Sequence, residues 1–146
     1  YSPDLVQLPL NVLDQRLVAS GHLRELHARG VEIHARSVFL QGLLLMKPDL
    51  IPGNLAATKP KIAAFNEWCE ARGLSPVQGA LAFIQNIDQV DYVIMGVTSA
   101  SELKELIAGF EVALGEDVDF APFACADERV LNPAHWTESA ESKRIP

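Results

Sequence analysis

Alternation of apolar and polar side chains over residues 31–36 is the feature that most restricts the fold of this chain. This period of two is typical of a β-strand. A helical segment over residues 21–29 precedes the strand, and a polar, turn-forming exit ending at Gly42 follows it. Because α/β proteins bind ligands at the carboxyl ends of their parallel strands, Arg36 and Ser37 at this exit are the first candidate site residues.

The rest of the chain repeats the alternation of strand and helix. Further strands are predicted over residues 4–8 and 90–95, and further helices over residues 60–72, 75–87 and 100–110. Such an order implies parallel strands joined by right-handed crossovers, with helices covering the sheet. The expected fold class is therefore α/β. Three strands are too few to bury both faces, and a closed eight-stranded barrel typically needs about 250 residues, so the chain corresponds to a little under half of one.

Local signals refine this outline. Residues 11–20 are predicted to be a loop, and residues 43–58 a long loop whose apolar content favours packing. Ser75 followed by Pro and, three residues on, by Gln78 is typical of a helix start. Another helix is expected near residues 127–131, and a frayed end over the polar residues 137–146. The helix after Ser99 carries apolar residues at the spacing of a core-facing stripe, at Leu103, Leu106, Ile107 and Phe110.

Composition narrows the function classes. The 146 residues are 49% hydrophobic and 21% charged, which suits one globular domain. A net charge of -7 and a pI near 5.0 argue against a nucleic-acid partner. No apolar run approaches the ~20 residues of a membrane helix, so no membrane partner is expected. Two cysteines form no disulfide framework, the four histidines lack metal-ligand spacing, and a cytoplasmic location is expected.

Three stretches resemble the carboxyl-terminal part of the aldo/keto reductases, over residues 1 to about 112. They are Gln7–Asn11, Arg36–Leu44 and Ile94–Ser99, and they resemble the ends of barrel strands six, seven and eight. The resemblance implies a partial (β/α)8 barrel, with residues 113–146 as a carboxyl-terminal extension. It also implies an NADP(H) or NAD(H) cofactor, hydride transfer to a small aldehyde or ketone, and an amino-terminal half of the barrel as partner. The start at Tyr1, without Met, likewise suggests a piece of a longer polypeptide.

The resemblance assigns cofactor-binding roles along the three strand ends. It implies that Gln7 bonds the nicotinamide carboxamide and that Arg36 occupies the position where many members stack a Tyr on the nicotinamide. By the same resemblance, the pyrophosphate is lined by Ser37, Phe39 and Gln41. The adenosine ribose and its 2′-phosphate are contacted by Gly96, Val97, Thr98 and Ser99, and the region near the ribose and adenine by Glu102 and Glu105. Gln7, Ser37 and Thr98 are expected to lie side by side on one rim.

This sequence departs from the family pattern at three places. No basic residue stands near the expected 2′-phosphate, where Glu102 is found instead, so we expect NAD(H) to bind at least as well as NADP(H). Arg36 replaces the aromatic residue. We expect either a preference for the reduced cofactor, because the oxidised nicotinamide is itself positive, or an Arg36 side chain that turns toward the pyrophosphate or an acidic substrate. Leu106 stands where members often carry an Asn.

No residue of this chain matches the catalytic Tyr, Lys, Asp and His of the family. Those motifs belong to the first half of the barrel, so we assign no catalytic residue and expect the chain alone to be inactive. A non-catalytic dinucleotide-sensing or partner-binding relative stays an alternative, as does an independent three-stranded binding domain.

Structural roles for the site residues also stay open. Gln7 could instead form hydrogen bonds with backbone groups at the strand end, and Arg36 could be an ordinary surface ion-pair partner. A turn or helix-cap role alone would also explain Ser37, Thr98 and Ser99. Likewise, Glu102 could be the second half of a capping box with Ser99. For Leu43–Met46, core packing is preferred over a substrate pocket.

Overall fold

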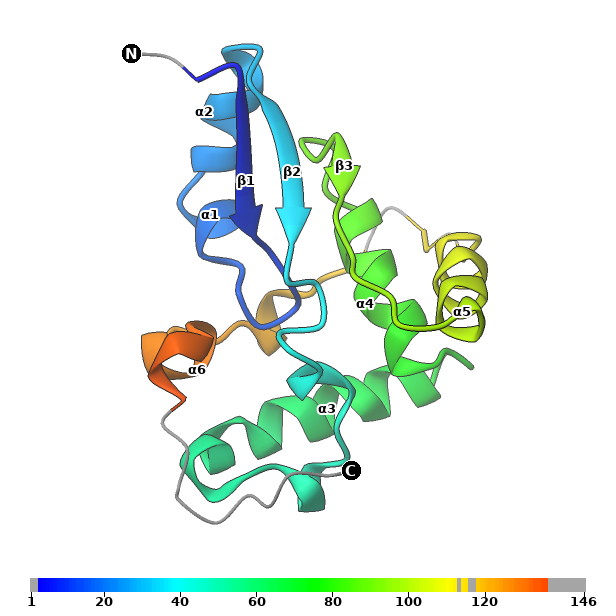
Figure 1. Cartoon of the computed structure of the whole chain (residues 1–146). Helices are drawn as coiled ribbons and strands as arrows, with labels where there is room; N and C mark the ends of the chain where they lie inside the picture. Colours follow the sequence, from blue (N-terminus) through cyan, green and yellow to red (C-terminus); the bar gives the residue numbers. More distant parts are fainter. Residues whose placement is uncertain (1–2, 113, 116–117, 137–146) are drawn as a thin grey trace.

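The computed structural model describes residues 3–112, 114–115 and 118–136, and it contains a three-stranded parallel sheet in the upper part of the molecule as drawn in Figure 1. The strands are β1 (Leu5–Pro9), β2 (Glu32–Arg36) and β3 (Tyr92–Val93), in the order β1-β2-β3. Both pairs are parallel, with Gln7 opposite His34 and His34 opposite Tyr92. The predicted parallel α/β arrangement is therefore confirmed.

The third strand is shorter than the predicted span of residues 90–95. Backbone hydrogen bonds from Asp91 N to Ile33 O (2.9 Å) and from Ile94 N to Ala35 O (2.8 Å) bracket its two paired residues. The ladder ends there because β2 itself ends at Arg36, and Ser37 turns into the left-handed region with a φ of 58°.

The two faces of the sheet differ in cover. Ile33 and Ala35 are fully buried on one face, where the helices pack. The other face is open within the described part of the chain. It carries polar and aromatic side chains, namely Gln7, Glu32, His34, Arg36 and Tyr92. On it, His34 Nε2 lies 2.6 Å from Glu32 Oε1, and the Tyr92 ring meets the His34 ring edge-on at 5.0 Å.

The helices mostly follow the predictions. They are α1 (Arg16–Ala19), α2 (His22–Ala28), α3 (Lys59–Glu70), α4 (Pro76–Gln85), α5 (Ala100–Phe110) and α6 (Glu128–Leu131). The short α1 lies where the sequence predicted only loop, because the side chain of Asn11 folds the chain into a turn before it. The capping box at Ser75 is confirmed: Gln78 N donates to Ser75 Oγ (3.2 Å), and Ser75 N donates to Gln78 Oε1 (2.8 Å).

The long loop is packed, as predicted. It contains three short 3₁₀ helices, η1 (Leu43–Leu45), η2 (Pro48–Leu50) and η3 (Gly53–Thr58). Leu43 and Leu44 are almost fully buried, so this part of the loop belongs to the core.

The predicted core-facing stripe of α5 is only partly correct. Leu106 is buried and Phe110 packs at the edge of the core, but Leu103 is 46% exposed and Ile107 57% exposed. The reason is that α5 contacts α4 through a narrow line around Leu106 and Gly109, where a Cβ on Gly109 would lie 2.5 Å from Leu81 Cδ1. The half of its apolar face that carries Leu103 and Ile107 is therefore only partly covered by the described residues.

The carboxyl-terminal segment returns across α3 and α4 toward the end of β1 (Figure 1). Its aromatic residues, in and beside η4 (Ala121–Phe123), join an aromatic cluster of Phe65, Trp68, Phe83, Phe120 and Phe123. Cys125 N donates to Leu13 O at 2.7 Å, which fixes the segment beside the β1 exit. Helix α6 confirms the helix predicted near residues 127–131, whereas the expected frayed end at 137–146 lies outside the described residues.

No helix in the described ranges is long and apolar enough to cross a membrane.

Candidate functional site at the strand ends

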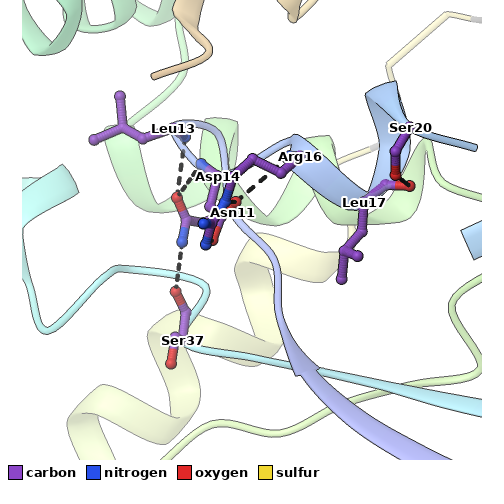
Figure 2. Close-up of polar contacts among 7 residues, drawn as sticks. All are labelled: Asn11, Leu13, Asp14, Arg16, Leu17, Ser20 and Ser37. Carbon is purple, nitrogen blue, oxygen red and sulfur yellow. Dashed lines mark hydrogen bonds and ion pairs between the residues drawn. The ribbon is translucent and has the colours of Figure 1, made fainter. Parts of the chain in front are cut away.

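Asn11 joins the exits of β1 and β2. Its side chain is completely buried, with Oδ1 accepting hydrogen bonds from the backbone N–H groups of Leu13 (3.0 Å) and Asp14 (2.9 Å). Its Nδ2 donates to the backbone carbonyl of Ser37 at 3.1 Å (Figure 2). Two loops that are far apart in sequence are thus held together by one amide. Asn11 is not among the predicted site residues, although Asn after an apolar run is a signal for an Asx turn.

The same exit loop orients Arg16 and holds the carboxyl-terminal segment. Asp14, only 3% exposed, accepts two hydrogen bonds from Arg16, Nε to Oδ1 at 2.8 Å and Nη2 to Oδ2 at 2.9 Å (Figure 2). This paired geometry raises the pKa of the Arg16 guanidinium, chiefly through the hydrogen bonds to Asp14. Next to it, Gln15 Nε2 donates to the carbonyls of Val12 and Phe120, both at 2.7 Å.

Residues 37–42 after β2 have an unusual backbone. Three non-glycine residues lie in the left-handed region, Ser37 (φ 58°), Leu40 (φ 46°) and Gln41 (φ 55°), directly before Gly42 (φ 82°). Each non-glycine residue in such a conformation costs roughly 1–3 kcal/mol unless its surroundings enforce it, and such residues concentrate at ligand sites. Here the buried Leu40 side chain and a hydrogen bond from Leu40 N to Ser37 O (2.9 Å) enforce it.

A hollow of about 330 Å³ lies between this loop and the chain after β3; we call it the β2–β3 hollow. Its walls are Ser37, Val38, Phe39, Gln41, Gly42, Ile94, Met95 and Gly96. All three residues assigned to the pyrophosphate, Ser37, Phe39 and Gln41, therefore meet Gly96 in one place. Within the described part of the chain, the backbone N–H groups of Phe39, Gln41 and Gly42 donate no hydrogen bond, so they are free to meet an anion.

The start of α5 differs in detail from the predicted capping box. Glu102 N donates to Ser99 Oγ at 3.1 Å, as expected of a cap. The Glu102 carboxylate, however, is held mainly by Thr98, accepting from its backbone N–H at 2.6 Å and from its Oγ1 at 2.9 Å, while the backbone N–H of Ser99 makes a weaker contribution. These hydrogen bonds lower the pKa of the Glu102 carboxyl, which is therefore ionised at neutral pH.

The other predicted residues lie apart from the β2–β3 hollow. Gln7 lies on the open sheet face, two residues before the end of β1, and Glu105 lies exposed in α5. Val97 is 41% exposed and does not line the hollow, and Leu106 packs into the core.

A second hollow, of about 260 Å³, lies at the ends of β1 and β2 under the carboxyl-terminal segment; we call it the β1–β2 hollow. Its walls are Pro9, Arg16, Arg36, Ser37, Leu40, Glu128, Leu131, Asn132 and Pro133. Ser37 borders both hollows, whereas Arg36 lines only this one.

Metal and thiol chemistry find little support in the described residues. No group of three or more His, Cys, Asp or Glu side chains there is arranged to hold a metal ion. Burial raises the pKa of the Cys69 thiol to about 12, which makes it a poor nucleophile.

Comparison with known families decides the identity. The sequence model of the Aldo/keto reductase family matches residues 1–120. The chain belongs to the aldo/keto reductase family. No curated protein matches the chain. Membership suggests an oxidoreductase, and the parallel sheet with covering helices is consistent with part of the barrel of this family.

Proposed function

We propose that this chain is the cofactor-binding, carboxyl-terminal part of an aldo/keto reductase that reduces a small aldehyde or ketone to an alcohol. The observation that carries the proposal is the β2–β3 hollow, where Ser37, Phe39, Gln41 and Gly96 meet at the carboxyl ends of parallel strands. Ligands of parallel α/β sheets bind at such ends. A cytoplasmic location, where thiols stay reduced, is part of the same proposal.

The residues of the β2–β3 hollow fit a dinucleotide pyrophosphate. The free N–H groups of Phe39, Gln41 and Gly42 offer donors to phosphate oxygens, and the Ser37 hydroxyl and the Gln41 amide add two side-chain groups. A Cβ on Gly96 would meet no atom within 4 Å, so the wall is open for close approach of a ligand. The strained backbone of residues 37–42 holds these donors in place before the ligand arrives.

The chain's part in the reaction is to bind and orient. When bound, the reduced nicotinamide supplies a hydride to the carbonyl carbon. Gln7, on the open face of β1 beside β2, is proposed to hold the nicotinamide carboxamide by its own side-chain amide. We propose that the proton for the new hydroxyl comes from a group outside residues 1–146.

Glu102 is proposed to make the protein bind NAD(H) at least as well as NADP(H). Its carboxylate already accepts hydrogen bonds from the N–H and the hydroxyl of Thr98, so these two donors are not available to a 2′-phosphate. A charged 2′-phosphate is repelled by this carboxylate, whereas a ribose diol can donate to it. Titrating NADH and NADPH into the full-length protein tests the proposal. A tenfold or greater preference for NADPH would contradict it, and Glu102→Gln is expected to strengthen NADPH binding while leaving NADH within about threefold.

The rest of the barrel is proposed to come from another part of the polypeptide. The sheet has two edge strands, β1 and β3, and one face open within the described residues. Exposed apolar side chains gather along β3 and α5, at Tyr92, Ile94, Val97, Leu103 and Ile107. In this proposal residues 1–112 complete the barrel, and residues 113–146 extend beyond it.

Carbonyl-dependent oxidation of NADH or NADPH by the full-length protein is the test of the proposed function. We expect consumption of the reduced nicotinamide with small aldehydes, and its loss when Ser37→Trp fills the β2–β3 hollow. Leu50→Trp, at an exposed loop position, is the matched control. Dinucleotide binding without any turnover would favour the sensing or partner-binding alternative, and no dinucleotide binding at all would exclude both.

A further inference from the structure

The β1–β2 hollow is a second built site, formed by three segments. The end of β1 and its exit loop supply Pro9 and Arg16, the end of β2 supplies Arg36, and the carboxyl-terminal segment closes the remaining side. That segment is fixed by hydrogen bonds from Cys125 N to Leu13 O and from Gln15 Nε2 to Phe120 O, both 2.7 Å. At about 260 Å³ the hollow is slightly below the usual ligand pocket, so it suits a small molecule.

Arg36 brings an uncompensated positive charge into this hollow. Its Nη1 donates to Ser37 Oγ at 3.2 Å, and within the described part of the chain the rest of the guanidinium fork makes no hydrogen bond. The ion pairs of the described residues are Arg16 with Asp14, His34 with Glu32, and Arg129 with Asp127, and Arg36 takes part in none of them. A guanidinium fork matches the two oxygens of a carboxylate.

The other charges around the hollow limit what it can bind. Arg16 is already paired with Asp14 through two hydrogen bonds, so its charge is largely balanced. Glu128 also lines the hollow and opposes an anion. One free guanidinium against one opposing carboxylate suits a singly charged carboxylate better than a doubly charged phosphate.

We infer that the carbonyl substrate carries a carboxylate group, and that Arg36 binds it in the β1–β2 hollow. The inference rests on the proposed reductase function and names its substrate class. Ser37 borders both hollows, so a carboxylate on Arg36 lies next to the proposed pyrophosphate site without occupying it. Arg36 is then a specificity residue, not a partner of the nicotinamide.

A pair of four-carbon aldehydes tests this with the full-length protein. 4-Oxobutanoate carries a carboxylate and butanal does not. We expect kcat/KM for 4-oxobutanoate to exceed that for butanal by at least tenfold. Arg36→Gln should lower the value for 4-oxobutanoate about 10- to 100-fold, mainly through KM, because a charge-assisted hydrogen-bonded pair is lost. The kcat/KM for butanal should change by less than about threefold in the same variant.

Three further variants sharpen the test. Arg36→Lys keeps the charge without the fork and should fall between the native protein and Arg36→Gln. Glu128→Gln removes the opposing charge and should raise kcat/KM for 4-oxobutanoate alone. Arg24→Gln, an exposed arginine of α2 outside both hollows, is the control and should change neither aldehyde.

The outcomes separate this inference from the proposed function. Equal reduction of both aldehydes, or an equal loss of both in Arg36→Gln, overturns the carboxylate assignment and leaves the reductase proposal intact. If the protein reduces neither these two aldehydes nor any other small aldehyde, the proposed reductase function fails, and this inference fails with it.

Discussion

Asn11 shows how one buried side chain can organise a ligand site without touching the ligand. Its amide satisfies two N–H groups of its own loop and the carbonyl of Ser37. Ser37 lies in the left-handed region and borders both hollows, so the hydrogen bond from Asn11 fixes the residue that separates the two proposed ligands.

Replacing Asn11 by Ala is expected to destabilise the protein and loosen the β2 exit. The N–H groups of Leu13 and Asp14 lose their acceptor in a buried environment, and each buried unsatisfied group costs about 1–3 kcal/mol. We expect a loss of about 2–4 kcal/mol in the free energy of unfolding, measured in urea on the full-length protein. Asn86→Ala, at an exposed position, should stay within about 0.5 kcal/mol. Equal effects of the two substitutions would contradict the role given to Asn11.

Glu102 gives the start of α5 a dependence on pH. Hydrogen bonds from Thr98 lower its pKa below the ordinary value of 4.5, so the folded state holds the ionised form. A lowered pKa in the folded state contributes stability above the unfolded pKa, and this contribution is lost as the pH falls through the folded value. An NMR titration of the side-chain carboxyls should place the midpoint of Glu102 below the ordinary glutamate value of 4.5. In the Glu102→Gln variant, the stability that the Glu102 carboxylate gives to the start of α5 should no longer depend on pH.

At the scale of elements, α3 and α4 approach each other closely because Gly79 lacks a side chain. A Cβ there would lie 2.5 Å from Cys69 Sγ and 3.1 Å from Phe65 Cζ. Gly is ordinarily unfavourable inside a helix by up to about 1 kcal/mol relative to Ala. Its presence in α4 is therefore explained by helix packing.

Gly79→Ala is accordingly expected to destabilise the protein, by about 1–3 kcal/mol, despite the better helix propensity of Ala. Thermal or urea unfolding of the full-length protein measures the change. In the background of Cys69→Ala the clashing sulfur is gone, so the same substitution should cost clearly less. If Gly79→Ala costs the same in both backgrounds, the contact with Cys69 is not its cause.

The order of strands and helices could be predicted from the sequence, because period and capping signals are local. Ser75 and Gln78 illustrate this, since their reciprocal hydrogen bonds depend only on a spacing of three residues. The left-handed conformations of Leu40 and Gln41 could not be predicted, because neither residue type prefers them and buried neighbours impose them. The sequence predicted that Ser37 and Gly96 would lie at neighbouring strand ends, but not that Asn11 would link two of these exits.

At the scale of the whole molecule, the apolar half of α5 and the open sheet face are two surfaces that the described residues leave uncovered. The periodicity of Leu103 and Ile107 correctly indicated an amphipathic helix, but a period cannot show which segment covers it. Tyr92, on the edge strand β3, is 59% exposed on the open sheet face. Within the described residues, Leu103 and Ile107 leave an exposed apolar strip on α5, and contiguous apolar surface of this kind marks an interaction site.

Ile107→Ser in the full-length protein tests whether this surface is covered. If helices and strands from elsewhere in the polypeptide complete a barrel, Ile107 is buried there, and its replacement should cost about 1.5–3 kcal/mol of unfolding free energy. Ala108→Ser, at the neighbouring exposed position, is the control. In residues 1–146 alone, where Ile107 is 57% exposed, the same substitution should be nearly neutral and should reduce binding of a hydrophobic dye. A neutral effect in the full-length protein would mean that the face of α5 stays open, and the partial barrel would then need another explanation for its apolar edge.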